Sequence, residues 1–515
     1  MILLEVIMTP ARLLRAAPLL LLVACSGGGN TSAASASATG ETTGTSGTTG
    51  GTDTGSGTDT DATTGDSMEA CFGDLSGQPI PGPWDPRQPS LENCTVRGQR
   101  EYRAILHLHS PHSHDACDND PQPGGVFNEP CLADQRAGLC ATRIDVAFLS
   151  DHPAYAEDAT IEAMALIRGD DEPITNAMGE VVGNWLRCDD GHKVLLLPGI
   201  ESGEMMPFAL ERHAPEGTYG ESSPASFQAI ADAGGVKWVA HTEQRMADEL
   251  APLGLDGLEF YQLHANLDPD IRQDYLGLDP SGFLTDVMPF FFPTGAGAEP
   301  DLAPLGFLLP NEPSMATFEA LGQTQRLTIS AGTDAHENVL PTKVADGERI
   351  DSYRRMMRWF NNRLKVQGAL SPETARAALR SGQNHIVFES LGTPYGFDFY
   401  AEQGGAVAAE NGAEVKLGPG LEIVATVPTL DPRSPRSDEA PLTRAALIRA
   451  GANGRETLIE WTAGELRYEI DAPGVYRVEV YITPHHLAPY LGDYVDDLLD
   501  KELPWVYSGG IFVRP

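Results

Sequence analysis

The sequence predicts an α/β fold, in which a barrel of alternating strands and helices precedes a smaller antiparallel β-sandwich-like domain. Three observations predict this fold. Short apolar runs that end in histidine or an acidic residue recur from Tyr102 to His336. Helix-like segments alternate with these runs, which is typical of parallel βα units. From about residue 392, short β-rich runs are separated by Pro, Gly and Asn-Gly, which is typical of an antiparallel sandwich.

The N-terminal segment, residues 1–25, has the order of an export signal. Arg12 and Arg15 precede an apolar run that is too short to span a bilayer and that ends in Leu22-Val-Ala-Cys25. This ending resembles a bacterial lipobox, in which Cys25 is the site of lipid attachment. We therefore expect a lipoprotein of the bacterial cell envelope, anchored at the outer membrane and facing the periplasm or the exterior. An ordinary signal with a chance cysteine is the alternative.

Residues 26–68 consist almost wholly of Gly, Ser, Thr, Ala and Asp. Such a composition cannot bury apolar surface, so we expect a flexible tether after the acylated cysteine. The roughly 450 residues that follow are too many for one small core. We therefore expect a catalytic barrel over residues 69–390 and a β-rich domain over residues 391–515.

The charge balance bears on the class of partner. The formal net charge is −38, with 73 acidic residues against 35 Lys and Arg. Such a surface repels the phosphates of a nucleic acid, so a nucleic-acid polymer is not the expected partner. We expect a small-molecule substrate, and contact with the membrane through the N-terminal lipid.

Beyond Cys25 the cysteine count is even, which in an exported protein indicates up to three disulfides. The six cysteines are Cys71, Cys94, Cys117, Cys131, Cys140 and Cys188. Their pairing cannot be deduced from the sequence. A thiolate metal site is the weaker alternative because the chain has no Cys-x-x-Cys pair. The segment from Cys117 to Cys140 follows a histidine-rich stretch directly, so a disulfide there is expected to brace the rim of a site.

That histidine-rich stretch, Ile105–Asp115, carries the strongest chemical signal. It continues an apolar run that predicts a short buried strand and that ends in His107-x-His109. Because side chains two apart in a strand point to the same side, both imidazoles can face one point. Three more polar side chains follow at once: His112, His114 and Asp115. Such a set is costly to bury as neutral core and suits a divalent metal, although a solvated, adventitiously metal-binding loop is the alternative.

Five further predicted strands end in the same kinds of residue. They are Val146–Leu149 before Asp151 and His152, Val194–Leu197 before Glu201, Val236–Ala240 before His241, Gly257–Tyr261 before His264, and Leu327–Ser330 before Asp334 and His336. Polar residues at the carboxyl ends of several parallel strands are how a βα barrel builds its active site. Convergence on a shared metal site explains the pattern better than chance does.

These ordered motifs resemble those of the PHP (polymerase and histidinol phosphatase) superfamily of metal-dependent hydrolases. The motifs are His-x-His, Ser-Asp-His, Gly-x-Glu, an isolated His after a strand, and Gly-Thr-Asp-Ala-His, and the likeness spans Tyr102–Glu389. The resemblance implies a distorted (β/α)7 barrel that holds two or three divalent metal ions, Zn, Mn or Fe. The stretch Pro504–Val513 also resembles the end of exported members, including a branch with carbamate and ester hydrolases.

The resemblance further implies a ligand set. The first metal would be held by His107, His109, Glu201 and Asp334, a second by the bridging Glu201 with His241 and His264, and a third by Asp115, His152 and His336. The chain departs from the family pattern at Asp115, where trinuclear members often have His and where His114 could substitute. It also departs at Gln262, where Asn is expected. Asp151 is expected to orient His152.

These residues predict a hydrolase in which metal-activated water is the nucleophile, with a phosphoesterase as the leading activity. The expected catalytic residues are Asp334, His241 and His336, and either histidine could protonate the leaving group. Arg245 and Lys343 are candidate substrate-binding cations, although isolated cations are usually surface charges. Two alternatives stay open: a carbamate, ester or amide hydrolase on the same metals, and a metal-binding lipoprotein without catalysis.

Two helices can be placed from their ends. Ser371 and Pro372 form an N-cap and first turn, and Gly382 is a stop signal. Pro224–Ala233 is predicted as a helix that is closed by two glycines.

Overall fold

The structure, a computed structural model, describes residues 95–515 apart from 204, 293–294, 432–438 and 495–497. The predicted signal, the lipobox cysteine and the tether lie outside the described residues, as do Cys71 and Cys94. None of the helices in the described ranges combines the length and the apolar character that crossing a bilayer requires.

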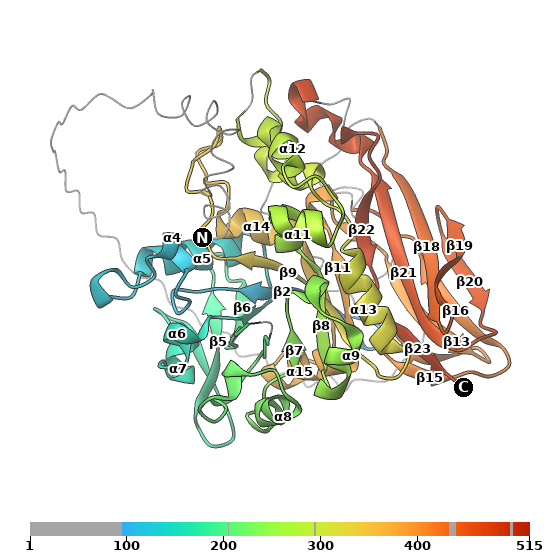
Figure 1. The fold of residues 1–515 in the computed structure, drawn as a ribbon, viewed down its shortest axis with the longest axis horizontal. Helices are drawn as coiled ribbons and strands as arrows, with labels where there is room; N and C mark the ends of the chain where they lie inside the picture. The colour runs from blue at the N-terminus through green and yellow to red at the C-terminus, as the bar shows by residue number, and fades with distance from the viewer. Residues whose placement is uncertain (1–94, 204, 293–294, 432–438, 495–497) are drawn as a thin grey trace, which may run out of the picture. The chain divides into compact units, whose positions relative to one another are not determined.

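The described chain has a mixed α/β architecture (Figure 1). Its strands form a 17-stranded mixed sheet, a separate four-stranded antiparallel sheet and a two-stranded pair. The predicted α/β class is therefore confirmed for the described residues, and so is the change to antiparallel strands in the C-terminal part.

The strands that carry the predicted motifs are parallel neighbours. Their order across the sheet is β7 (Trp238–Val239), β8 (Gly257–Gln262), β9 (Thr328–Ala335), β2 (Gln99–Leu108), β3 (Val146–Leu149) and β6 (Lys193–Leu197). Their apolar residues are almost all fully buried, as in parallel strands that are covered on both faces. Because the strands run parallel, their carboxyl ends lie at one edge of the sheet.

The segment after β6 lies between β6 and β7. Ile200 forms a parallel bridge with Asp151, two residues after the end of β3. Further along the segment, Phe208 forms an antiparallel bridge with Val236, and its amide donates to the Val236 carbonyl oxygen over 3.2 Å. The backbone that carries Glu201 therefore has partners on both sides.

Helices separate most of these strands (Figure 1). They are α4 (Ala116–Asn119), α5 (Glu129–Ala141), α6 (Pro153–Ala156), α7 (Ile161–Met164), α8 (Pro224–Asp232), α9 (Ala247–Leu250), α10 (Leu263–Leu267), α11 (Pro269–Asp274), α12 (Gly282–Phe291), α13 (Glu312–Gly322), α14 (Tyr353–Trp359) and α15 (Pro372–Ser381).

The two helices placed from their ends are confirmed as α8 and α15. The hydroxyl of Ser371 accepts from the amide of Thr374 over 3.2 Å, and Gly382 ends α15 with φ +79°. A side chain at Gly382 would also meet the Cα of Gly412 at 2.4 Å, so both conformation and space require glycine there.

The C-terminal strands extend the large sheet. The added strands are β10 (Asn361–Gln367), β11 (Asn384–Val387), β15 (Glu414–Lys416), β18 (Leu442–Gly451), β19 (Gly454–Trp461), β21 (Gly474–Thr483), β22 (Leu503–Tyr507) and β23 (Ile511–Arg514). Antiparallel pairing of β10 with β2, and of β11 with β10 and β22, joins these strands to the parallel ones. The four-stranded sheet contains β14 (Ala406–Glu410), β13 (Asp398–Gln403), β16 (Leu421–Thr426) and β20 (Glu465–Glu469).

The remaining strands are β1 (Thr95–Val96), β4 (Glu172–Thr175), β5 (Val181–Arg187), β12 (Pro394–Tyr395) and β17 (Thr429–Leu430). Two disulfides link described residues, Cys117–Cys131 and Cys140–Cys188. The first confirms the expected disulfide in the segment after the histidine-rich stretch. Both fit a location outside the reducing cytoplasm.

Candidate metal centre

The predicted ligands gather at the carboxyl ends of the parallel strands. They form three groups in which the ligand atoms lie within 4.8 Å of one another: His107, His109, Glu201 and Asp334; His109, Asp115, His152 and His336; and His241, His264 and Asp334. All nine predicted metal ligands belong to at least one group. Residues from His107 to His336 therefore converge as the strand-end pattern predicts.

The groups overlap in a way that differs from the expected ligand set. His109 belongs to the first two groups, and Asp334 belongs to the first and third. The expected bridge was Glu201, which is not in the His241 group, although its Oε1 lies 3.0 Å from His241 Nε2. The side chains that link neighbouring groups are thus His109 and Asp334.

The first group is held in the protein interior. His107 Nε2 lies 2.8 Å from Glu201 Oε2 and 3.0 Å from Asp334 Oδ1. His109 Nε2 lies 3.2 Å from each of the same two oxygens. Both imidazoles are fully buried, so four ligand atoms from three strand ends face one small volume.

Electrostatics in this group favour ionised acids and a protonated His107, whereas burial and the neighbouring His336 lower the pKa of His109. Burial alone would lower the pKa of His107, but Glu201, Glu259 and Asp334 together raise that pKa well above its ordinary value. Burial would raise the pKa of Glu201, but His107 more than any other group holds it well below its ordinary value. Burial also opposes a proton on His241, yet Glu201 raises the pKa of His241 to about 10. Binding of a cation would displace such protons.

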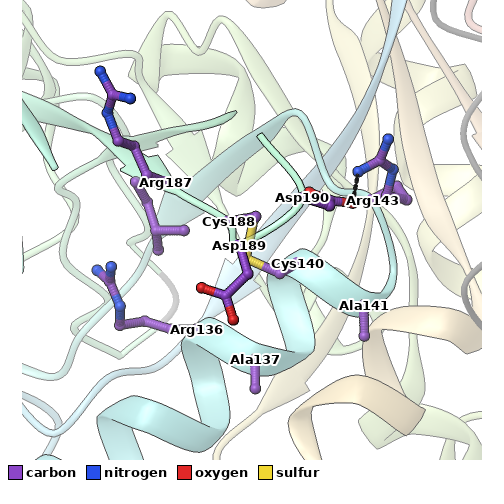
Figure 2. A pocket seen from close by; sticks show the side chains of 10 residues that line it. Arg136, Ala137, Cys140, Ala141, Arg143, Arg187, Cys188, Asp189 and Asp190 are labelled. Carbon is purple, nitrogen blue, oxygen red and sulfur yellow. Dashed lines mark hydrogen bonds and ion pairs between the residues drawn. A yellow bond between two sulfur atoms is a disulfide. The ribbon is translucent and has the colours of Figure 1, made fainter. Parts of the chain in front are cut away.

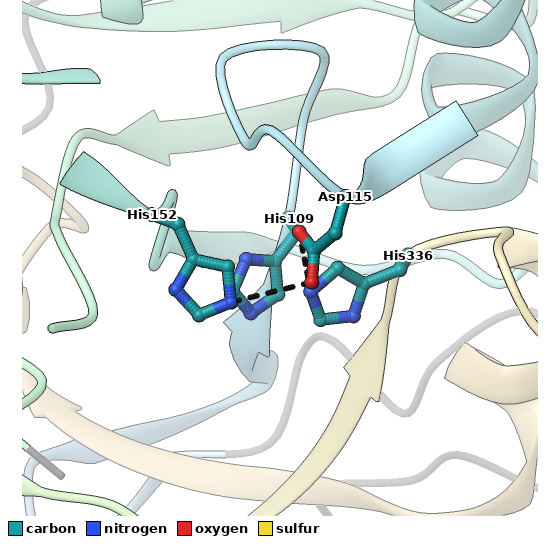
Figure 3. Close-up of side chains that lie close together, drawn as sticks. All are labelled: His109, Asp115, His152 and His336. Atoms are coloured by element: carbon teal, nitrogen blue, oxygen red, sulfur yellow. Dashed lines mark ion pairs between the residues drawn. The ribbon is translucent and has the colours of Figure 1, made fainter. Parts of the chain in front are cut away.

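The second group surrounds Asp115 (Figure 3). Its two carboxylate oxygens lie 3.5 Å from His336 Nε2 and from His152 Nε2. The rings of His109 and His336 stack with centroids 3.6 Å apart. Burial would lower the pKa of His152, but its interaction with Asp115 raises that pKa to about 9. Asp115, and not His114, therefore belongs to this group.

The third group lies on the His241 side. The rings of His241 and His264 meet edge to face, with centroids 5.2 Å apart. His264 Nε2 lies 3.7 Å from Asp268 Oδ2, one helical turn farther along. Gln262, where the family pattern has Asn, is buried, and neither polar atom of its side chain makes a hydrogen bond among the described residues.

The donor set fits divalent cations. Among the described residues, Asp334 Oδ1 meets imidazole nitrogens at 3.0–3.2 Å, and His336 Nε2 and His241 Nδ1 are buried without a hydrogen bond. A buried polar atom left so costs roughly 1–3 kcal/mol. A cation would satisfy the imidazole and carboxylate lone pairs, and mixed nitrogen and oxygen ligands suit Zn, Mn or Fe.

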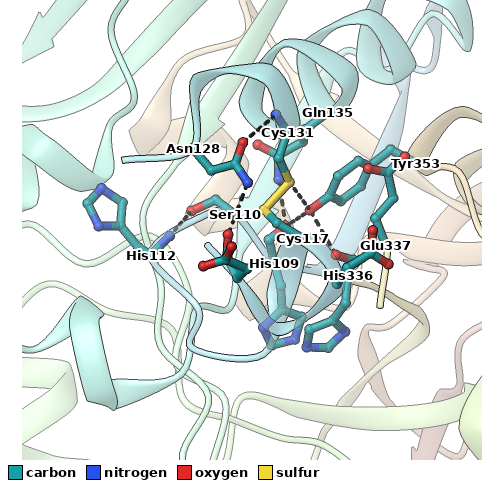
Figure 4. The surroundings of a disulfide bond; sticks show 12 residues. His109, Ser110, His112, Cys117, Asn128, Cys131, Gln135, His336, Glu337 and Tyr353 are labelled. Atoms are coloured by element: carbon teal, nitrogen blue, oxygen red, sulfur yellow. Dashed lines mark hydrogen bonds between the residues drawn. A yellow bond between two sulfur atoms is a disulfide. The ribbon is translucent and has the colours of Figure 1, made fainter. Parts of the chain in front are cut away.

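The backbone around His109 is fixed by side chains that are not ligands (Figure 4). Tyr353 Oη and Gln135 Nε2 lie 2.9 and 2.8 Å from the His109 carbonyl oxygen, to which both donate. The amide of Cys117 donates to the His336 carbonyl oxygen over 2.9 Å, and its sulfur is bonded to Cys131. The disulfide therefore ties the Asp115 segment to α5 directly beside the cluster.

Asp151 has a different role from the expected one. Its carboxylate accepts from the amide and the hydroxyl of Ser110, over 2.5 and 2.8 Å. His152 Nδ1 instead lies 3.0 Å from the Glu201 carbonyl oxygen. Asp151 thus orders the loop after His109 rather than the His152 ring.

The remaining sequence candidates are not in the three groups. His112 is buried, and its Nε2 lies 3.2 Å from the Ala163 carbonyl oxygen, so it belongs to the packing of α7. His114 is exposed at the rim, with its ring 5.2 Å from that of His152. Arg245 forms an ion pair with Glu249 at 3.3 Å, and Lys343 lies exposed in the loop after β9.

Two buried acids near the ligands escaped the sequence analysis. Glu259, in the middle of β8, lies 2.6 Å from His107 Nδ1. Glu243, two residues after His241, is buried and neither of its carboxylate oxygens makes a hydrogen bond among the described residues. A charged residue inside an otherwise apolar strand was the available signal for Glu259.

A hollow of about 830 Å³ lies elsewhere, beside the Cys140–Cys188 disulfide (Figure 2). None of its lining residues is a candidate ligand. Its arginines form ion pairs, Arg136 with Asp171, Arg143 with Asp190, and Arg187 with Glu172. With these cations neutralised, the hollow offers little attraction for an anionic ligand.

Comparison with known proteins adds no relative: no family model matches the chain, and no curated protein matches it. The site therefore has to be interpreted from its own geometry.

Proposed function

We propose that the protein is an exported, lipid-anchored, metal-dependent hydrolase that acts on a small molecule, with a phosphoesterase as the leading activity. One observation carries the proposal: three overlapping groups of imidazoles and carboxylates meet at the carboxyl ends of parallel strands. Closely spaced cation sites are typical of enzymes that hydrolyse phosphate esters.

The proposal includes membership of the PHP superfamily and a distorted (β/α)7 barrel over residues 69–390, followed by a β-sandwich-like domain over residues 391–515. The order of the motifs supports this family. The parallel neighbours from β7 to β6, and the bridges of the segment after β6 to both sides, support a strongly curved sheet.

In the proposed mechanism, the three groups would hold two or three divalent ions, Zn, Mn or Fe. Such ions acidify water at neutral pH and neutralise charge that develops on the leaving oxygen. His241 or His336 would give a proton from an imidazole nitrogen to the leaving group. Asp334 belongs to two groups, so its carboxylate would fix the positions of their ligand atoms relative to each other.

A second candidate, a carbamate, ester or amide hydrolase at the same centre, is favoured by a different observation. The ion-pair partners recorded for Asp115, Glu201 and Asp334 are all histidines. Arg245 pairs with Glu249 at 3.3 Å, and Lys343 is exposed in the loop after β9. A centre whose acids pair with imidazoles also suits a neutral substrate, because phosphate binding commonly adds Arg or Lys to the metals.

The test is turnover of metal-reconstituted protein on aryl phosphate mono- and diesters, carbamates and carboxylic esters. Asp334→Ala should lower turnover at least about 100-fold, since it removes a ligand from two groups. Asp398→Ala, a buried aspartate outside the groups, is the matched control and should keep turnover. Full activity of the Asp334 variant, or of protein stripped of metal, would disprove the hydrolase. Metal binding without turnover on any substrate would favour the non-catalytic lipoprotein.

A further inference from the structure

We propose that Glu259 is a positioning residue that sets the geometry of the metal centre. It would do so by holding the imidazole of His107 and the backbone of His241 with one carboxylate. The inference rests on the proposed function, because it assumes that these two histidines bind cations.

The first contact fixes the ring of His107. Glu259 Oε1 lies 2.6 Å from His107 Nδ1, and both side chains are buried. A carboxylate at this distance keeps the proton on Nδ1, so Nε2, which faces Glu201 and Asp334, is the nitrogen that would offer its lone pair to a cation. A partner of this kind fixes the tautomer of a ligand histidine and makes it more basic.

The second contact fixes the strand end that carries His241. The amide of His241 donates to Glu259 Oε2 over 2.9 Å, and the hydroxyl of Thr242 donates to the Glu259 carbonyl oxygen. One residue of β8 therefore connects a ligand side chain on β2 with the ligand backbone after β7.

Both connected histidines have backbone conformations that need such support. His107 has φ +71° and His241 has φ +51°, and Asp334, in the same cluster, has φ +53°. A non-glycine residue in this region is strained and persists only where its surroundings enforce the conformation. Glu259 contacts two of these three strained ligands.

The neighbouring strand leaves space for the carboxylate. An added Cβ at Gly332 would meet Glu259 Oε1 at 1.8 Å and the Cβ of His107 at 3.0 Å. No larger residue therefore fits opposite Glu259 while the carboxylate keeps its place. This contact gives a physical reason for the glycine that opens Gly332-Thr-Asp-Ala-His336.

The experiment uses the full chain. It measures the affinity for Zn²⁺ by competition with a chromophoric chelator, together with metal content and thermal unfolding. Glu259→Gln keeps the size of the side chain and removes its charge, and it should weaken the tightest Zn²⁺ binding by about 10–100-fold. Glu259→Asp keeps the charge but withdraws it by one methylene, so this variant should lose less Zn²⁺ affinity than Glu259→Gln.

The matched control is Glu479→Gln on β21. Glu479 is also a buried glutamate, but it pairs with Arg455 and Arg477. This control should lose stability without losing Zn²⁺ affinity. Wild-type affinity in both Glu259 variants, or an equal loss in the control, would overturn the positioning role. If Glu259→Gln does not fold, the Glu259→Asp comparison decides.

The result separates the two proposals. Loss of Zn²⁺ affinity in the Glu259 variants, in a protein without turnover on any substrate, would overturn the hydrolase and keep the positioning role. Normal turnover by wild type with unchanged Zn²⁺ affinity in both variants would overturn the positioning role alone.

Discussion

Two buried clusters of charge lie within the α/β part of the chain, and they are neutralised by different chemistry. At the carboxyl ends of β2, β6, β7 and β9, the carboxylates of Glu201 and Asp334 pair with imidazoles. At Glu389, two residues after the end of β11, a single carboxylate is surrounded by guanidinium groups.

The carboxylate of Glu389 has little capacity to exchange its partners for a metal ion. The Arg103 guanidinium donates to both oxygens of Glu389, Arg363 lies 3.0 Å away, and Arg358 lies 3.3 Å away. The side-chain amide of Asn361 and the hydroxyl of Thr393 also donate to the carboxylate of Glu389. Burial would raise the pKa of Glu389, but the arginines hold that pKa well below its ordinary value.

The difference teaches how burial of charge relates to function. Guanidinium stays charged at any physiological pH, so the Glu389 cluster is a permanent structural link. Imidazole can be neutral or protonated, so His107 and His241 can give up their protons when a cation binds beside the same acids. Buried charge alone is therefore not a functional signal, whereas buried charge on exchangeable partners is.

The largest expected effect is a loss of stability when the Glu389 cluster is broken. Glu389→Gln leaves buried guanidinium groups without their anion, so the free energy of unfolding should fall by about 3–5 kcal/mol. Urea unfolding measures this loss. Zn²⁺ content should stay at the wild-type level, because no ligand is changed. A variant with wild-type stability would contradict the structural role of Glu389.

A smaller effect is expected at the other cluster, where imidazoles pair with the acids and a cation can replace their protons. Zn²⁺ at about 100 times its dissociation constant should stabilise wild-type protein by about 2.7 kcal/mol per site, because the cation binds only the folded state. Thermal unfolding with and without Zn²⁺ measures the gain. Glu389→Gln should keep the gain and Asp334→Ala should lose most of it. An equal gain in both variants would show that the ion binds elsewhere.

The smallest expected effect concerns Asp398, an acid that pairs with Lys and Arg and not with histidine. Burial would raise its pKa, but Lys365 and Arg97 lower it to about 2. Because the folded-state pKa lies below the unfolded value, ionised Asp398 stabilises the protein above about pH 4, by about 2 kcal/mol. The gain is lost as pH falls toward 2. Urea unfolding between pH 2 and pH 7 should show this loss in wild type and not in Asp398→Asn, and identical profiles would contradict it.

Much of the candidate site could be predicted because local pattern specifies it. A short apolar run followed at once by a histidine or an acid places a side chain at a strand end, and this holds for His107, Glu201 and Asp334. Strand boundaries were less exact: β9 continues to Ala335 instead of ending at Ser330. The helix α15 was predictable because its cap and stop residues are adjacent in sequence.

The rest depended on contacts between distant segments. Glu259 lies inside an apolar strand, and nothing in its neighbourhood along the chain indicates that His107, 152 residues away, is its partner. The sharing of His109 and Asp334 between groups depends on angles between strands, which residue spacing does not encode. For the same reason Arg103, visible in the sequence as an interruption of an apolar run, could not be assigned to Glu389.

That sharing has a thermodynamic consequence. His109 and Asp334 each belong to two neighbouring groups, so occupancy of one position changes the free energy of filling the next. A cation that draws His109 toward its own position orders the ring for the adjacent one and competes with it for the same lone pair. Titration should therefore follow a cooperative isotherm, positive or negative, rather than the sum of independent steps.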